Sequence, residues 1–443
     1  MAKKVLKHYL KSVQSSLDNS QQGGLNDAMS NYYAECRANA AIRFVDYKNL
    51  KQRGILRKHN AVNDLVKKLI HFETAFTGKG GKIVWAETKE DAVEAILDIL
   101  EKKNAKHIVK TNSNTLDEIN ISEELQKNNL KIFNLEFNAE SKDKILLDGG
   151  LRETARLWQK QMDFYTETVE ETLDCLKAYM LAKCTEGEVA ITGANFLVSD
   201  IGAIVSLEEK GNIAIAKNIP RTQIVVVGID KMLSSISELD NFLYLLSVNT
   251  VNKLLPFRVN ITTGANKNEQ QEIYLVLLDN KRSKVIGYKN QRGIAHCIHC
   301  DACKYVCPVY KLVGDAGYDQ HNTGPLAAVL NPLANNSERA FIDAFNCTMC
   351  KKCSEVCPMD IPLHKLILNN RKLGVDTNMQ PLFDSLTKKI IRKISLNRKS
   401  TDSRFEAWLL RNKFKKIVEN SKVYPEPVEK SFNKLWKESQ VGI

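Results

Sequence analysis

The chain of 443 residues carries a formal net charge of +12, and 43% of its residues are hydrophobic. That length predicts two to three domains with a sizeable core, which excludes a small ferredoxin. No apolar stretch approaches the ~20 residues that span a bilayer, and the first residues, MAKKVLKHYLKSVQSS, lack the apolar core of a signal peptide. We therefore expect a soluble, cytoplasmic protein, a compartment in which thiols stay reduced.

The first part of the chain predicts a helical arm and then alternating helices and strands. Residues 1–60 are polar and helix-prone, with Leu6, Leu10, Val13 and Leu17 on one face. From residue 61 the apolar periodicity predicts helices at 62–72, 89–102 and 116–128, and strands at 82–85, 107–110 and 130–135. This alternation predicts an α/β domain.

A segment rich in glycine follows a long predicted helix at 151–183. Strand-like runs lie at 189–191, 203–207, 212–216 and 223–227, and Gly193, Gly202, Gly211 and Gly228 punctuate them. Turn glycines in a buried sheet explain this pattern. A phosphate-binding loop is not predicted, because no Gly-x-Gly-x-x-Gly or Gly-Lys-Ser/Thr follows a strand. One more strand is expected at 273–278.

Eight of the eleven cysteines form two rows of identical spacing, each closed by Cys-Pro. The first row is Cys297, Cys300, Cys303 and Cys307, and the second is Cys347, Cys350, Cys353 and Cys357. This pattern, Cys-x-x-Cys-x-x-Cys-x-x-x-Cys-Pro, is typical of chains that bind 4Fe-4S clusters. The 39 residues between the rows include predicted helices at 326–330 and 338–345, which favours a helical ferredoxin module over the compact β-hairpin kind.

The doubled pattern also predicts which cysteines share a cluster. In two-cluster ferredoxins the fourth cysteine of each row binds the other cluster. We therefore assign Cys297, Cys300, Cys303 and Cys357 to cluster 1, and Cys347, Cys350, Cys353 and Cys307 to cluster 2. Clusters that share ligand loops lie close together, which makes an electron relay.

Two other uses of these cysteines fit the sequence less well. Zinc sites typically use paired Cys-x-x-Cys and four ligands, and disulfide frameworks are typical of short secreted chains. Neither accounts for three evenly spaced cysteines plus a crossing fourth. Cys36, Cys175 and Cys184 belong to neither row and are expected to be small buried hydrophobic residues.

Most of the excess positive charge lies in the C-terminal part of the chain. Residues 371–443 carry 17 Lys and Arg against 8 Asp and Glu, a net charge of +9. Runs such as 388–393 and 408–416 place basic residues between apolar ones at helical spacing, which predicts a basic helical tail. A solvated helix face is the first interpretation, and contact with an acidic protein or peripheral attachment to the inner face of the cell membrane is the second. Nucleic-acid binding is not predicted, because no recognised motif accompanies the charge.

Several polar residues outside the cysteine rows are candidates for a site. Lys110 and Ser113 lie where a strand turns into a helix, a place that favours an anion. We favour the alternative, in which Ser113, Asn114 or Thr115 caps the helix and Glu118 reaches back in a capping box. Asp200 and Lys231 are weaker candidates, since both residue types are common in surface turns.

The histidines and tryptophans receive simpler interpretations. His296 and His299 flank Cys297 and Cys300, but cysteines already fill all eight ligand positions, so these histidines could at most tune a cluster through hydrogen bonds to sulfur. His321 and His364 are expected to be structural. The four tryptophans are expected in the core or at interfaces; they are Trp85, Trp158, Trp408 and Trp436.

Motifs over roughly residues 60–370 carry a family resemblance. They are Ile191-Thr192-Gly193-Ala194-Asn195-Phe196, Ser199-Asp200-Ile201-Gly202, Glu209-Lys210-Gly211-Asn212, Val227-Gly228-Ile229-Asp230-Lys231, Cys307-Pro308-Val309-Tyr310, Gly314, Tyr318, Gly324-Pro325 and Cys357-Pro358-Met359-Asp360-Ile361-Pro362-Leu363. With these motifs the chain resembles the lactate-utilisation protein B family, in which a lactate-utilisation (LUD) domain is joined to a helical two-cluster ferredoxin module.

The resemblance implies a fold, a set of partners and an activity. It implies a LUD domain of the sugar-isomerase and CoA-transferase-like α/β class at 61–290 and a ferredoxin module with two 4Fe-4S clusters at 291–372. An N-terminal helical arm at 1–60 and a basic helical tail at 373–443 flank them. It also implies two partners, a cysteine-rich oxidoreductase subunit and a smaller LUD protein, which work with the chain to oxidise L-lactate to pyruvate.

The sequence departs from the family pattern in segment 112–138. The family's Lys-Ser-Lys-Ser-Met is Lys110-Thr111-Asn112-Ser113-Asn114 here, so the second lysine is absent. The Glu-Thr-Asp-Leu-Gly-Glu segment expected after Ile132 is replaced by Asn134-Leu135-Glu136-Phe137-Asn138. Two interpretations follow: a LUD domain with an altered small-molecule site, or one that has lost that site.

Three functional hypotheses remain. The first is an electron-transfer subunit of an oxidoreductase that oxidises L-lactate to pyruvate. The second is a relay for another 2-hydroxy acid dehydrogenase, such as one acting on glycolate. The third is a scaffold with a catalytically silent LUD domain. No flavin or nicotinamide motif is recognised, so the two-electron step is expected on a partner chain.

Overall fold

The structure is a computed structural model that describes residues 46–135, 168–208, 212–250, 258–265, 271–318, 322–334 and 337–379, with isolated positions before residue 46 and after residue 379. Residues 3–379 form one compact unit and residues 380–443 belong to a second. The predicted basic tail, most of the predicted arm, and Cys36, Trp158, His321 and Trp408 lie outside the described residues. None of the helices in the described ranges is both long and apolar enough to cross a membrane.

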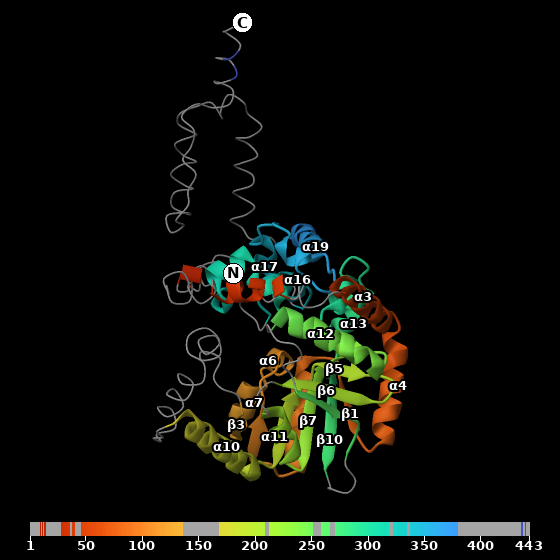
Figure 1. Cartoon of the computed structure of the whole chain (residues 1–443), viewed down its shortest axis with the longest axis vertical. Coiled ribbons are helices and arrows are strands. Elements are labelled where there is room, and N and C mark those ends of the chain that lie inside the picture. The colour runs from red at the N-terminus through yellow and green to blue at the C-terminus, as the bar shows by residue number, and fades with distance from the viewer. Residues whose placement is uncertain are drawn as a thin grey trace. The chain divides into compact units, whose positions relative to one another are not determined.

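A six-stranded parallel sheet forms the core of the α/β part of the first unit, drawn in the lower half of Figure 1. Its strands are β1 (Lys82–Ala86), β2 (His107–Lys110), β3 (Lys131–Asn134), β4 (Val189–Gly193), β7 (Thr222–Gly228) and β10 (Glu272–Leu278), in the order β1-β10-β7-β4-β2-β3. Every neighbouring pair is parallel. The direction of winding reverses between β2 and β4, and such a reversal opens a crevice at the carboxyl ends of the strands.

Helices cover both faces of this sheet because its strands are apolar on both sides. One face, with Ile108, Ile191, Ile224 and Val276, packs against helices α5 (Lys89–Lys102), α6 (Asn114–Glu118) and α7 (Ile121–Lys127). On the other face the alternate residues pack against α4 (Leu65–Gly78), α10 (Val169–Glu186) and α11 (Asn212–Asn218). Capping boxes begin α5 at Thr88 and α10 at Thr168.

A smaller sheet connects this α/β layer to the cysteine rows. It has the order β8-β5-β6-β9, with β5 (Phe196–Val198), β6 (Ala203–Glu208), β8 (Met232–Leu233) and β9 (Arg258–Thr262). Helices α3 (Tyr47–Asn63) and α12 (Leu239–Thr250) pack beside it. Phe196 and Phe242 from this layer share one hydrophobic core with Cys300, Cys303 and Cys357, so the cysteine rows are built onto the α/β domain.

The part of the chain that carries the cysteine rows is built of helices. After α13 (Arg282–Gly287) come α14 (Ala302–Tyr305), α15 (Pro308–Val313), α16 (Gly324–Ala334), α17 (Glu338–Phe345), α18 (Lys352–Glu355) and α19 (Leu363–Asp376). Figure 1 labels α13, α16, α17 and α19 among them. Short 3-10 turns lie at Ile229–Lys231, Ile236–Glu238, Arg292–His296 and Asp315–Gly317. Pro308 follows Cys307 at the start of α15, where a proline loses no helical hydrogen bond. No strand occurs among the described residues of this helical module, as the long spacer predicts.

Several expected elements differ in the structure. The strand expected at 212–216 is wrong: these residues begin α11, because the Glu208 carboxylate accepts from the backbone N–H groups of Ile213 and Ala214 at the start of this helix. The helix expected at 116–128 is two helices, separated where Asn120 adopts a left-handed backbone conformation. The helix expected at 62–72 is interrupted at Asp64, between α3 and α4. Strands β5, β8 and β9 and helix α12 were not predicted.

Candidate cluster sites and an adjoining polar hollow

The first cysteine-lined cavity gathers side chains from both rows. Cys297, Cys300 and Cys303 line it together with Cys357 of the second row. Most of the remaining lining is apolar, with Ile298, Leu326, Met359, Ile361 and Leu363, and Asp301 is the acidic residue among the lining side chains. The first cavity is therefore a largely apolar pocket that presents four thiols.

The second cavity has the reciprocal composition. Cys347, Cys350 and Cys353 line it together with Cys307 of the first row. Its surroundings are more polar, since Tyr318, Asp343, Lys351 and His364 also line it. Cys350 is exposed, whereas its counterpart Cys300 is buried.

The two rows have the same backbone conformation in their loops. His299 and Asp301 in the first row and Met349 and Lys351 in the second have φ values between 54° and 65°. Non-glycine residues adopt this left-handed conformation rarely, and it is concentrated at functional sites. It turns N–H groups toward sulfur: His299 N lies 3.3 Å from Cys297 Sγ, and Met349 N lies 3.4 Å from Cys347 Sγ. Such hydrogen bonds to sulfur help to set cluster potentials.

Burial disfavours loss of the thiol proton at six of the eight cysteines. Burial raises the pKa of the Cys297 and Cys353 thiols to about 12, and it also raises the pKa of Cys300, Cys303, Cys307 and Cys357. Thiolates are the ligating form, so iron binding has to release these protons. Four convergent thiols, an apolar wall and N–H groups directed at sulfur fit a 4Fe-4S cluster in each cavity.

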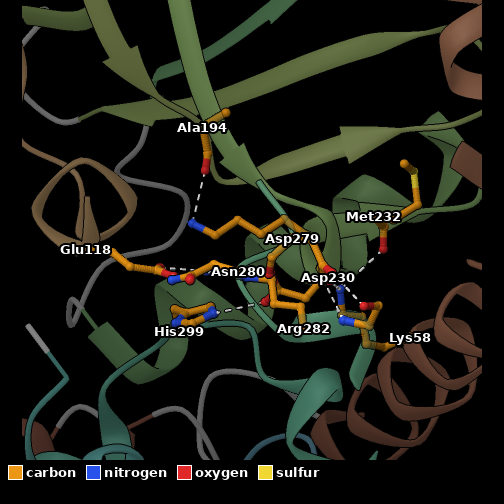
Figure 2. Close-up of polar contacts among 11 residues, drawn as sticks. Lys58, Glu118, Ala194, Asp230, Met232, Asp279, Asn280, Arg282 and His299 are labelled. Atoms are coloured by element: carbon orange, nitrogen blue, oxygen red, sulfur yellow. Dashed lines mark hydrogen bonds and ion pairs between the residues drawn. The ribbon is translucent and has the colours of Figure 1, made fainter. Parts of the chain in front are cut away.

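A charged network joins the α/β domain to the first cysteine row (Figure 2). Arg282, at the start of α13, donates from Nε to Asp230 Oδ1 (2.7 Å) and from Nη2 to Glu118 Oε2 (2.6 Å). His299 lies on the other side of Asp230, with its Nε2 3.5 Å from Oδ2. Burial alone would raise the pKa of Asp230, but the charge of Arg282 and the contact with His299 hold it well below its usual range.

Two lysines complete the network. Lys58 of α3 is fully buried and donates from Nζ to the carbonyl oxygens of Asp230 (2.5 Å) and Met232 (3.2 Å), and burial lowers its pKa to about 8. Lys231 donates from Nζ to the Ala194 carbonyl oxygen (3.1 Å), and burial lowers its pKa as well. Gly228 makes room here, because a Cβ at this position would lie 2.4 Å from Asp230 Oδ1 and 2.5 Å from Arg282 Nε.

A hollow with a cavity volume of about 100 Å³, partly open to solvent, lies between this network and the first cysteine row. Residues that follow the carboxyl ends of β2, β7 and β10 line it: Asn114 and Glu118, Asp230 and Lys231, and Asn280 and Arg282. Cys297 and His299 line it from the cysteine row. A crevice at the carboxyl ends of parallel strands is the usual ligand position in sheets of this kind.

The structure assigns different roles to the residues singled out near this edge. Ser113 caps α6, as favoured, by accepting from Thr115 N at 3.3 Å. The predicted capping box is wrong, because the Glu118 carboxylate is turned to Arg282 and Asn280 instead. Lys110 is buried and its Nζ lies 3.3 Å from Asn112 Oδ1.

Other candidates have structural roles or lie elsewhere. Asp200 accepts from Ser235 Oγ and Ile236 N, which holds a loop. It is the backbone N–H of His299, not its ring, that donates to sulfur. His364 contacts Ser354, as expected of a structural residue. Cys184 is buried, whereas Cys175 is exposed, contrary to expectation. Trp85 and Trp436 are 47% and 55% exposed, so neither lies in the core.

Sequence reasoning missed Lys58, Glu118 and Arg282 as members of one network. They are separated by 60 or more residues and no local pattern connects them. Lys231 was a candidate from the sequence, and Asp230 appeared only within the motif 227–231, directly after a buried strand.

Comparison with known proteins identifies both parts of the chain. Residues 69–286 match the LUD domain and residues 293–361 match the 4Fe-4S dicluster domain. The second match indicates that the protein has two 4Fe-4S clusters. Fold and site thus define a LUD-domain protein joined to a two-cluster iron–sulfur module.

Relatives that match most of the chain identify the particular family. Lactate utilization protein B of Bacillus licheniformis is 30% identical over 82% of this chain and 80% of that protein. Lactate utilization protein B of Bacillus subtilis is 31% identical over 66% of this chain and 64% of that protein, and protein B 2 of Bacillus mycoides is 28% identical over 84% and 82%. The chain belongs to the lactate utilization protein B family. A solved DUF162 family protein from Deinococcus radiodurans is similar with 11% identity and a TM-score of 0.31, over 48% of this chain and 98% of that one.

Proposed function

We propose that this protein is the iron–sulfur electron-transfer subunit of a multi-subunit oxidoreductase that oxidises L-lactate to pyruvate. The observation that carries the proposal is the pair of cavities, each with three cysteines of one row and the fourth of the other. The relatives' names supply the substrate.

The cavity linings support the ligand assignment that the spacing predicts. Cluster 1 would be held by Cys297, Cys300, Cys303 and Cys357, and cluster 2 by Cys347, Cys350, Cys353 and Cys307. Each 4Fe-4S cluster carries one electron at a time. Because residues 303–307 and 353–357 each connect the two cavities, an electron has a short path from one site to the other.

The chemistry of lactate divides the work among subunits. Oxidation of L-lactate to pyruvate releases two electrons and two protons, and single-electron carriers need a two-electron centre upstream. We infer that a partner chain holds that centre. The resemblance favours a cysteine-rich oxidoreductase subunit and a smaller LUD protein as partners, and the basic tail could meet an acidic protein or a membrane surface.

We also propose a structural class for the LUD domain, which is more specific than the family match. We place the LUD domain, residues 61–290, in the sugar-isomerase and CoA-transferase-like class. The six-stranded parallel sheet with helices on both faces supports this placement. The ferredoxin module is placed at 291–372, between this domain and the basic tail.

Anaerobic co-purification from the native cell tests the function. We expect L-lactate to bleach the cluster absorbance, to produce a low-temperature EPR signal of paired clusters and to release pyruvate. A panel of hydroxy acids that includes glycolate tests the alternative of a relay for another 2-hydroxy acid dehydrogenase. If glycolate bleaches the clusters and L-lactate does not, glycolate and not lactate is the substrate. Clusters that respond to dithionite and to no hydroxy acid would contradict the proposal.

The scaffold alternative makes a different prediction for Cys347→Ser. A scaffold with a silent LUD domain keeps both complex assembly and turnover when cluster 2 is crippled. We expect the variant to assemble with its partners and to lose lactate-dependent turnover, which pull-down and pyruvate assays on the same sample measure together.

A further inference from the structure

We propose that the hollow at the carboxyl ends of β2, β7 and β10 binds a small monocarboxylate, L-lactate or pyruvate, whose carboxylate pairs with the ammonium group of Lys231. The inference rests on the proposed function for the identity of the acid. It goes further by placing an acid-binding site on this chain, next to cluster 1.

The ammonium group of Lys231 has hydrogen-bond donors left for a ligand. Its Nζ donates to one carbonyl oxygen, that of Ala194, which employs one of three protons. Across the described ranges no carboxylate forms an ion pair with it. Burial lowers the pKa of Lys231 more than the nearby charges of Asp230 and Glu118 raise it, so an anion that enters the hollow would stabilise the charged form.

Two other cations line the hollow: Lys281, which is exposed and donates to the Ala334 carbonyl oxygen, and Arg282, which is already paired. Arg282 spends both terminal nitrogens on Glu118 and its Nε on Asp230. This pairing keeps the two carboxylates from repelling a negative ligand. Arg282 therefore prepares the electrostatics of the hollow, whereas Lys231 is placed to meet the ligand.

Lys231 is the partly buried lysine that lines the hollow, whereas Lys281 is exposed and Arg282 is already paired. A single carboxylate in the hollow therefore has Lys231 as its first partner. The amides of Asn114 and Asn280 also line the hollow and offer neutral hydrogen-bonding groups for a hydroxyl or keto oxygen.

Because the hollow adjoins Cys297, a ligand bound there should change the reduction potential of cluster 1. Cys297 lines both the hollow and the first cysteine cavity. A bound anion makes the arrival of another negative charge on cluster 1 less favourable. Occupancy of the hollow should therefore lower the reduction potential of cluster 1 and leave that of cluster 2 nearly unchanged.

Titration of the full chain with both clusters reconstituted tests the proposal. Under anaerobic conditions we expect saturable binding of L-lactate or pyruvate by calorimetry, and a lowered potential of cluster 1 in EPR-monitored redox titration. Lys231→Gln should weaken binding by about tenfold or more, because the ligand loses a charge-assisted hydrogen bond to the ammonium group. Lys231→Arg should retain most of it, and iron content with circular dichroism checks that both variants fold.

Lys217→Gln is the matched control. Lys217 is a buried lysine of the same domain whose pKa burial lowers to about 8, but it lies outside the hollow. Its replacement should leave acid binding unchanged. Absence of binding by the wild-type chain, or equal binding by the Lys231→Gln variant, would overturn the proposal.

The two proposals fail separately. If the isolated chain binds no acid while the purified complex still reduces its clusters with L-lactate, the site is wrong and the electron-transfer function stands. If the chain binds pyruvate through Lys231 while no complex passes electrons from L-lactate, the site stands and the function is wrong.

Discussion

The two cysteine rows share their spacing and their left-handed loop residues, yet the protein surrounds them differently. The first cavity is apolar, and its Cys297 adjoins the charged network of the LUD domain. The second is lined by Lys351, Asp343 and His364, and its Cys350 is exposed. A duplicated motif thus fixes the ligand geometry twice, while tertiary packing gives each site its own electrostatics.

The largest expected effect tests whether the rows exchange their fourth cysteine. Cys357→Ser should remove cluster 1, although the residue belongs to the second row. Iron content should fall by about half, since one of two 4Fe-4S clusters is lost. Its EPR spectrum should match that of Cys300→Ser and differ from that of Cys350→Ser. A spectrum matching Cys350→Ser would assign each row to its own cluster.

Removing the arginine of the network tests whether only the first site depends on the LUD domain. Arg282→Met leaves Asp230 and Glu118 buried without their partner, so the free energy of unfolding should fall by ~3–5 kcal/mol in urea. EPR should show cluster 1 perturbed and cluster 2 intact.

The control is Lys82→Met, which breaks a pair at the sheet edge where Lys82 is 50% exposed. Surface pairs contribute ~0–1 kcal/mol, so this variant should unfold almost like the wild type. Equal losses in the two variants would contradict a special role for the network.

A titrating lysine remote from both cysteine rows should change stability without changing either cluster. Burial lowers the pKa of Lys217 from 10.5 to about 8, against the influence of Glu208. Above pH 8 the unfolded chain holds a proton that the folded chain releases, so stability should rise with pH. Between pH 8 and 9.5 the gain is on the order of 2 kcal/mol.

Urea unfolding of the wild type and of Lys217→Met across this pH range measures the effect. The Lys217→Met variant should lack this pH-dependent increase in the free energy of unfolding. A parallel pH response in both proteins would show that Lys217 stays charged in the folded state, and a change in either cluster's EPR signal would contradict its independence.

The smallest expected effect concerns the matched residues Asp301 and Lys351. They occupy the same position in the two rows with φ values of 56° and 65°. A positive charge favours the reduced cluster, so Asp301→Lys should raise the potential of cluster 1 and Lys351→Asp should lower that of cluster 2. The shifts should be on the order of tens of millivolts, reduced by solvent and salt. Redox titration of both variants measures them, and shifts of the same sign would refute the electrostatic account.

The sequence predicted the features that repeat locally. The cysteine spacing indicated two clusters, and β-branched runs such as 223–227 predicted buried strands of the parallel sheet. The short run 212–216 misled because its apolar alternation fits a strand, while a long-range contact from Glu208 starts a helix. The hollow could not be predicted, since its lining residues Glu118, Asp230 and Arg282 lie more than 50 residues apart in the sequence.

One hydrophobic core contains four ligand cysteines together with residues of the α/β domain, so the stability of the fold depends on the supply of iron. These residues are Cys300, Cys303, Cys353, Cys357, Phe196, Phe242 and Leu245. A chain that has received no iron leaves cavities in the middle of the apolar layer between its two parts. Poorly filled cores open more often, and proteases degrade the opened form. We expect the cellular abundance of this protein to follow the supply of iron and sulfide, so that iron starvation depletes the subunit itself and not only its redox centres.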